Sequence, residues 1–142
     1  MIYTEEVFAI EDQLNELIEK ITESYTMEKL ISSKIAMEAS EDVQSKINSF
    51  SAAKRSFEPV EAYGKHAPDY QEKRRAVRQE KRRIDTDPLI MNFRRNESDL
   101  QEILDTISYR LAQTVSPDIK IDAGNPFFEF AQRGCGGSCH VG

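Results

Sequence analysis

Residues 89–115, LIMNFRRNESDLQEILDTISYRLAQTV, carry the pattern that decides the fold class. Their apolar side chains recur at steps of three and four residues, which is the period of an amphipathic α-helix. Asp87 can cap this helix, and Pro88 suits its first turn. A helix of about 28 residues is roughly 42 Å long, so we expect it to protrude or to pair with another chain. The apolar stripe consists of Leu89, Phe93, Leu100, Ile103, Leu104, Ile107, Leu111 and Val115.

Four shorter helices are expected before this one, because similar spacing recurs between capping and turn residues. Thr4 and Ser40 are candidate N-caps, and Pro68 is the expected first residue of the fourth helix. Gly64 should end the third helix, and Pro59 should kink or loosen it just before that end. The four helices are expected over about residues 4–24, 27–39, 41–64 and 68–84.

The composition favours long helices over sheets. Charged residues make up 31% of the 142 residues, Trp is absent, and there are only 6 Gly and 5 Pro. The sequence therefore predicts an all-α fold of about five helices in an antiparallel bundle, with one long C-terminal helix and a flexible Gly/Cys-containing tail. Most of the glycines follow residue 123, so we expect a helical bundle domain at residues 1–116 and a tail at residues 117–142.

The charge and the N-terminal sequence restrict the class of protein. The formal net charge is −6 and the sequence pI is about 5.0, which makes the chain a poor general nucleic-acid binder. The chain opens with no basic and apolar leader pattern, and no apolar run approaches the roughly 18 residues of a membrane span. We therefore expect a cytoplasmic protein without membrane insertion, whose thiols stay reduced.

Cys135 and Cys139 form the strongest candidate site, and they are separated by Gly-Gly-Ser. The glycines allow the backbone to wrap around an ion, and thiolates suit an iron–sulfur cluster or zinc. Even with the imidazole of His140, these ligands do not complete a four-coordinate site. A cluster would therefore need ligands from another chain. The alternatives are a thiol redox switch that forms a reversible disulfide, and two free thiols without a role.

The expected fourth helix carries a run of basic residues. Such a run can bind RNA phosphates or an acidic partner helix, or it can be a solvated face laced with ion pairs. The sequence thus leaves a helical RNA-binding protein as an alternative. The candidate nucleic-acid or partner surface consists of Arg74, Arg75, Arg78, Lys81 and Arg82.

Three aromatic residues, Phe127, Phe128 and Phe130, lie near the start of the tail. We expect them to dock, either on the chain itself or on a partner. His66 is expected to be a turn residue. The carboxylates occupy positions that look solvated, and no nucleophile, phosphate-loop or zinc-protease motif occurs. These observations disfavour an enzyme.

Three stretches together resemble the YlbF/YmcA family of small helical bacterial regulatory proteins, and within it the YlbF branch. They occur in the expected order and cover most of the chain. They are Ala62-Tyr-Gly-Lys-His-Ala-Pro-Asp-Tyr70, Glu97-Ser-Asp-Leu-Gln-Glu-Ile-Leu104 and Gly124-Asn-Pro-Phe-Phe128.

The resemblance implies a regulatory adaptor subunit without catalytic activity. The partners implied are YmcA-like and YaaT-like proteins, in a complex linked to an iron–sulfur cluster and to the endoribonuclease RNase Y, whose mRNA processing it helps direct. Competence, sporulation and biofilm formation are the implied traits, and the isolated protein should self-associate. Cys135 and Cys139 then correspond to the family's tail cysteines as cluster ligands, although this tail holds fewer cysteines than is usual in that branch.

Overall fold

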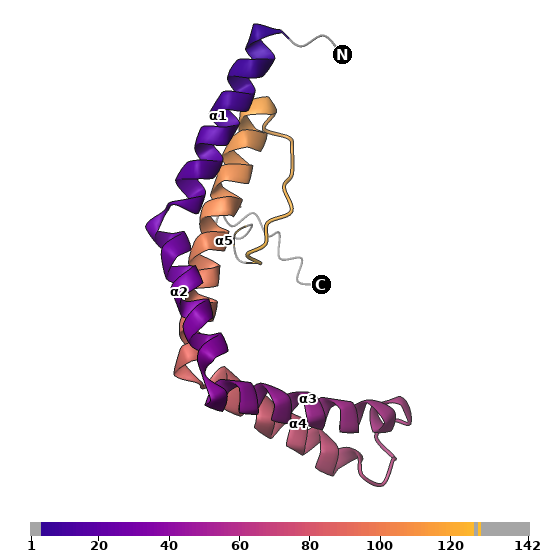
Figure 1. The fold of residues 1–142 in the computed structure, drawn as a ribbon. Coiled ribbons are helices and arrows are strands. Elements are labelled where there is room, and N and C mark those ends of the chain that lie inside the picture. The colour runs from indigo at the N-terminus through magenta and orange to yellow at the C-terminus, as the bar shows by residue number, and fades with distance from the viewer. Residues whose placement is uncertain (1–3, 127, 129–142) are drawn as a thin grey trace, which may run out of the picture. The chain divides into compact units, whose positions relative to one another are not determined.

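The computed structural model describes residues 4–126 and residue 128. No strand occurs in these residues, which confirms the predicted all-α class. The chain divides into two compact units, Met1–Arg95 and Asn96–Gly142, and the predicted division at residue 116 stays a prediction. The helices, labelled in Figure 1, are α1 (Glu5–Thr22), α2 (Tyr25–Ala39), α3 (Glu41–Ala62), α4 (Tyr70–Asp85) and α5 (Pro88–Val115).

Serine side chains cap two of these helices. The hydroxyl of Ser24 accepts a hydrogen bond from the N–H of Met27 at 3.2 Å, which allows α2 to begin two residues before the predicted start at Met27. The hydroxyl of Ser40 accepts from the N–H of Val43 at 3.4 Å and caps α3 as predicted. Side-chain oxygens of this kind satisfy N–H groups that have no partner inside the helix.

The start of α4 differs from the prediction by two residues. Pro68 lies in the turn before the helix, where the N–H of Tyr70 donates to the carbonyl of Ala67 at 3.1 Å. Asp69 is the N-cap residue, and its carbonyl accepts from the N–H of Lys73 at 3.0 Å. The proline ring fixes φ near about −65°, a value that turns use as well as helices, so proline alone does not mark the first helical residue.

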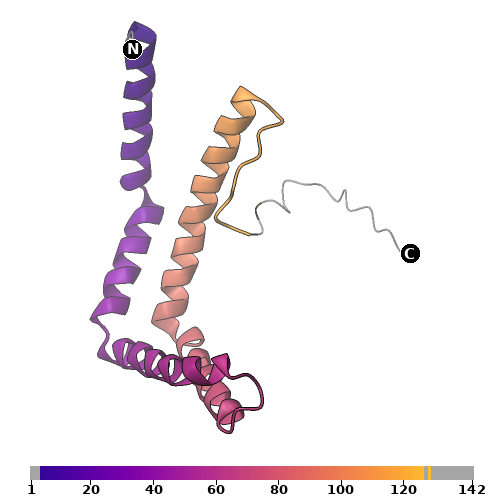
Figure 2. The same cartoon turned by 90° about the vertical axis from the view of Figure 1, so that its right-hand side faces the viewer.

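The best-packed part of the first unit is the hairpin of α3 and α4. These helices lie side by side in opposite directions in both views (Figures 1 and 2). At the open end of the hairpin, Val43, Ile84 and Ile90 form a buried cluster. Near the turn, the rings of Phe57 and Tyr70 are 5.4 Å apart. Burial of each such side chain contributes about 1.5–3 kcal/mol. The cluster is surrounded by partly buried Met37, Ile47, Phe50 and Leu89.

Asp87 connects the start of α5 to α3. Its carboxylate accepts from the N–H groups of Leu89 at 2.9 Å and Ile90 at 3.3 Å, which confirms it as the cap of α5. It also accepts from the ammonium of Lys46 at 2.7 Å. The Lys46 hydrogen bond is the main cause that lowers the pKa of Asp87, and together with the two backbone bonds it outweighs the effect of burial.

The turn between α3 and α4 contains the left-handed residue Gly64, whose φ is +80°. Nothing lies within 4 Å of the position that a Cβ would take there. The backbone conformation, rather than lack of space, therefore requires glycine. His66 lies in the same turn, as predicted, and is exposed.

In the second unit, the chain after α5 turns and runs back beside the helix (Figure 2). The turn begins at Ser116, whose carbonyl accepts from the N–H of Ile119 at 3.2 Å. Residues 117–126 are not helical, so their backbone N–H groups need partners elsewhere. Two of these N–H groups bond to one side chain of α5, as described below.

Candidate functional site

The predicted metal ligands Cys135, Cys139 and His140 lie outside the described residues. Within residues 4–126 and 128, no group of three or more His, Cys, Asp or Glu side chains is arranged to hold a metal ion. The described residues therefore hold no metal site of three or more such ligands of their own.

An apolar face on α1 is left uncovered within the first unit. No residue of this 18-residue helix is buried. Ile10 is 67% exposed, Leu14 52% and Ile18 50%, and these three residues lie on one side of the helix at steps of four. Large apolar side chains gathered on one exposed face indicate an interaction surface.

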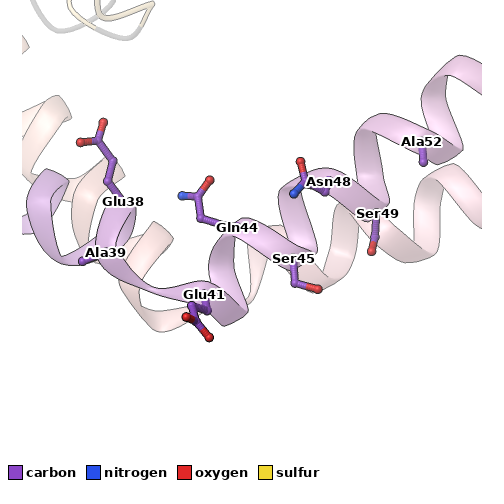
Figure 3. Close-up of a pocket in the computed structure, with 8 residues that line it drawn as sticks. All are labelled: Glu38, Ala39, Glu41, Gln44, Ser45, Asn48, Ser49 and Ala52. Carbon is purple, nitrogen blue, oxygen red and sulfur yellow. The ribbon is translucent and has the colours of Figure 1, made fainter.

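Helix α2 also exposes apolar side chains, because Ile31 and Ile35 are exposed four residues apart. A hollow of about 580 Å³ lies where α2 meets α3. Figure 3 shows its lining side chains spread along the bend rather than converging on one point. Small residues such as Ala39, Ser45 and Ala52 line it, and small side chains let another backbone approach closely. The hollow has the character of a contact surface for a protein.

The predicted basic surface on α4 separates into residues with different surroundings. Arg75, Arg78 and Arg82 are exposed, and no carboxylate lies within ion-pair distance of them in the described part of the chain. Arg74 is partly buried, with its guanidinium 5.9 Å from the centre of the Tyr70 ring. Lys81 is exposed but donates to the carboxylate of Asp85 at 2.6 Å.

A buried polar arrangement in the described part of the second unit is centred on Asp105 of α5. Its carboxylate accepts from the N–H of Gly124 at 2.9 Å and from the N–H of Asn125 at 2.8 Å. The amide of Gln101 donates a third hydrogen bond at 2.8 Å. We call this set of contacts the Asp105 anchor, because it fixes the returning segment to α5.

The anchor also sets the ionisation of Asp105. Burial is the largest influence and acts to raise the pKa, but the bonds from Asn125, Gly124 and Gln101 together outweigh it, so the pKa lies below its ordinary value. The carboxylate is thus charged at neutral pH. The expectation that the carboxylates are solvated is wrong for Asp105 and Asp87, which are 4% and 5% exposed.

One aromatic residue of the tail docks beside the anchor. Phe128 is 8% exposed, and its ring lies edge-on to that of Tyr109 with centroids 6.1 Å apart. Docking on the chain itself is therefore confirmed for Phe128. Phe127 and Phe130 lie outside the described residues.

Nothing in the sequence singled out Asp105. It sits one turn after Gln101 on a helix rich in acidic residues, and its partners follow it by 19 and 20 residues. The only local signal was Gly124-Asn125, a pair typical of turns.

Comparison with known proteins identifies a family that the chain matches. A family model described as "Control of competence regulator ComK, YlbF/YmcA" matches residues 10–116. Regulatory protein YlbF of Bacillus subtilis (strain 168) is 34% identical over 142 residues, which cover 100% of this chain and 95% of that protein.

The fold is also similar to a solved structure. A chain in the crystal structure of Bacillus subtilis RicA in complex with RicF is 32% identical, with a TM-score of 0.72, over 80% of this chain and 98% of that chain. Within the described residues, no helix combines the length and the hydropathy that a membrane span requires.

Proposed function

Because the chain belongs to the YlbF/YmcA family of competence-control proteins, we propose that it is a non-enzymatic regulatory subunit that acts by assembling with other proteins. The observation that carries this proposal is the apolar face of α1, a helix without a single buried residue. A helix of this kind gains most of its stability from packing, so a partner that covers Ile10, Leu14 and Ile18 would stabilise it.

The occupant that best fits this face is another helical member of the same family. The similar solved chain belongs to a complex of two proteins, RicA and RicF. An amphipathic helix pairs readily with a second one through residues at steps of three and four. Self-association of the isolated chain would use the same face.

We extend the proposal to a cytoplasmic complex with YmcA-like and YaaT-like proteins that directs mRNA processing by RNase Y, and through it competence, sporulation and biofilm formation. The family membership supports this role. The adaptor character rests on exposed helical faces and on the lack of converging side chains in the hollow between α2 and α3.

The tail contributes thiolates to an iron–sulfur cluster shared with the partners, with zinc as the alternative metal. Cys135 and Cys139 would each donate one sulfur, and His140 could donate a nitrogen. This set falls short of four ligands, so the partners would supply the rest. Such a cluster would supply redox sensitivity or hold the assembly together.

The assembly face can be tested by adding one charge to α1. Leu14→Glu places a carboxylate in the middle of the apolar face and should weaken assembly with a YmcA-like partner by at least about tenfold, because an unpaired charge would be buried. Ala9→Glu adds the same charge on another side of α1 and should leave assembly unchanged. Sedimentation velocity of the co-expressed full chains measures both. Equal assembly by the two variants and the unsubstituted protein would contradict the proposal.

The metal site needs a separate experiment. After anaerobic co-expression with the partners, Cys135→Ser and Cys139→Ser should each lower iron and acid-labile sulfide in the purified complex, whereas Ser138→Ala should not. Zinc without sulfide would reject the cluster and retain the thiolate ligands. Full metal content in both serine variants would show that the thiolates are not ligands.

A further inference from the structure

The positive charge of the chain is concentrated in one segment. Residues 54–83, which form most of the α3–α4 hairpin, carry ten basic and five acidic residues, a net charge of +5. The rest of the chain carries nine basic and twenty acidic residues, a net charge of −11. A local basic surface on an acidic protein attracts a polyanion to that surface alone.

Within the hairpin, three arginines form a stripe that faces solvent. Arg75, Arg78 and Arg82 follow one another by three and four residues, so they lie on one side of α4. The side chains that α4 packs inward, Tyr70 and Ile84, are on the other side. All three arginines are exposed and have no ion-pair partner within the described residues. We call these three residues the arginine stripe.

Unlike the arginine stripe, other cations of α4 form ion pairs. Lys73 and Arg83 do pair, with Asp69 at 3.8 Å and Glu80 at 3.2 Å. Like charges at steps of three and four destabilise a helix. The three arginines therefore lower helix stability in the free protein, and a bound polyanion would remove that repulsion.

The surroundings of the stripe favour a nucleic acid over an acidic protein. Protein interfaces have an apolar core with aromatic or aliphatic anchors. The exposed residues of α4 are charged or polar apart from Ala76. Phosphate recognition needs no apolar core, and guanidinium groups bind phosphates with two parallel hydrogen bonds.

An aromatic platform lies on the same hairpin. Tyr63 at the end of α3 is 84% exposed. Together with His66 and Pro68 it lines a hollow of about 420 Å³. Stacking on exposed aromatic rings is a usual means of binding unpaired bases.

We propose that the α3–α4 hairpin binds single-stranded RNA, with the arginine stripe on the phosphates and Tyr63 stacked on a base. The choice of RNA over DNA rests on the proposed role in mRNA processing. The phosphate chemistry is common to both.

The test measures the salt dependence of binding by the full chain, alone and in its assembled complex. A fluorescent single-stranded RNA of 20 nucleotides is the probe, and unlabelled single-stranded DNA and double-stranded RNA are competitors. Three phosphate contacts predict a slope of log K against log[salt] of about −2. Affinity should then fall about 20-fold between 50 and 200 mM salt.

The decisive variant is the triple substitution Arg75→Gln, Arg78→Gln and Arg82→Gln, which should bring the slope close to zero. The matched control, Lys34→Gln with Lys73→Gln and Arg83→Gln, removes the same charge from cations that are already paired. It should keep the slope near −2, because none of these three cations is assigned to a phosphate. Equal slopes in the two triple variants would overturn the stripe.

Tyr63 gives an independent readout. Tyr63→Ala should weaken RNA binding at least about fivefold without changing the slope, whereas Tyr63→Phe should keep the affinity. Tighter binding of double-stranded RNA or of DNA would overturn the assignment of the ligand. Sedimentation of each variant with its partners separates the two proposals. Loss of assembly with the arginine substitutions and unchanged RNA binding would identify the stripe as a protein contact and reject the RNA proposal.

Discussion

Replacement of Asp105 by Asn should release the segment that returns along α5. The carboxylate accepts three hydrogen bonds, from Gly124, Asn125 and Gln101. The amide of Asp105→Asn keeps one oxygen acceptor, but its NH₂ group would face a backbone N–H donor. One bond would be lost and the others would lose their charge. Because hydrogen bonds to charged groups contribute about 1.5–3 kcal/mol each, we expect a loss of about 2–4 kcal/mol.

The assay is native-state hydrogen exchange, read at single amides by NMR. A loss of about 2–4 kcal/mol corresponds to exchange about 30- to 700-fold faster at Gly124 and Asn125. Amides in α3 and α4 should be unaffected, since the change is local to the second unit. Asp99→Asn makes the same chemical change at an exposed position of α5 and is the control. If both variants exchange alike at Gly124 and Asn125, then Asp105 is not the acceptor in solution.

Three further predictions concern the same contacts and the cap of α5. A methyl group at Gly124 would lie 2.3 Å from the amide nitrogen of Gln101, so Gly124→Ala should lower the melting temperature, and Gln101→Ala in the same chain should restore part of it. Asp87→Ala removes both the cap of α5 and the bond from Lys46, and should cost about 2–4 kcal/mol in urea unfolding; an unchanged midpoint would show that neither contact matters. Because the pKa of Asp105 is lower when folded, its contribution is complete above the unfolded value of about 3.9 and is lost as pH falls through the folded value. After correction for intrinsic rates, protection of the Gly124 amide should therefore stay constant from pH 7 to 5. It should fall markedly below about pH 4. Asp105→Asn should abolish that pH dependence.

The helices were predictable because each one depends on local sequence. The α5 stripe and its Asp87-Pro88 start agree with the structure, since periodicity and capping act within one helical turn. The start of α4 was less certain from sequence, because Pro68 is compatible with a turn and with a helix. Pro68 belongs to the turn because the N–H of Tyr70 bonds to the carbonyl of Ala67 there.

The interaction surfaces were predictable only in part. The run of basic residues located α4, but the sequence could not separate Arg75 from Arg74, which lies over the ring of Tyr70. Neither spacing nor composition indicates which cations find a carboxylate. The Asp105 anchor joins residues about twenty positions apart, and such pairing depends on the path of the returning chain.

The positive φ of Gly64 has a consequence for the handedness of the residue that the hairpin turn accepts. An L-alanine would be strained there, although there is room for its methyl group. A D-alanine, introduced by chemical ligation, prefers this same conformation. It should stabilise the hairpin by about 0.4–1 kcal/mol, because it also restricts the unfolded chain. The turn would thus distinguish two mirror-image residues of identical size and polarity.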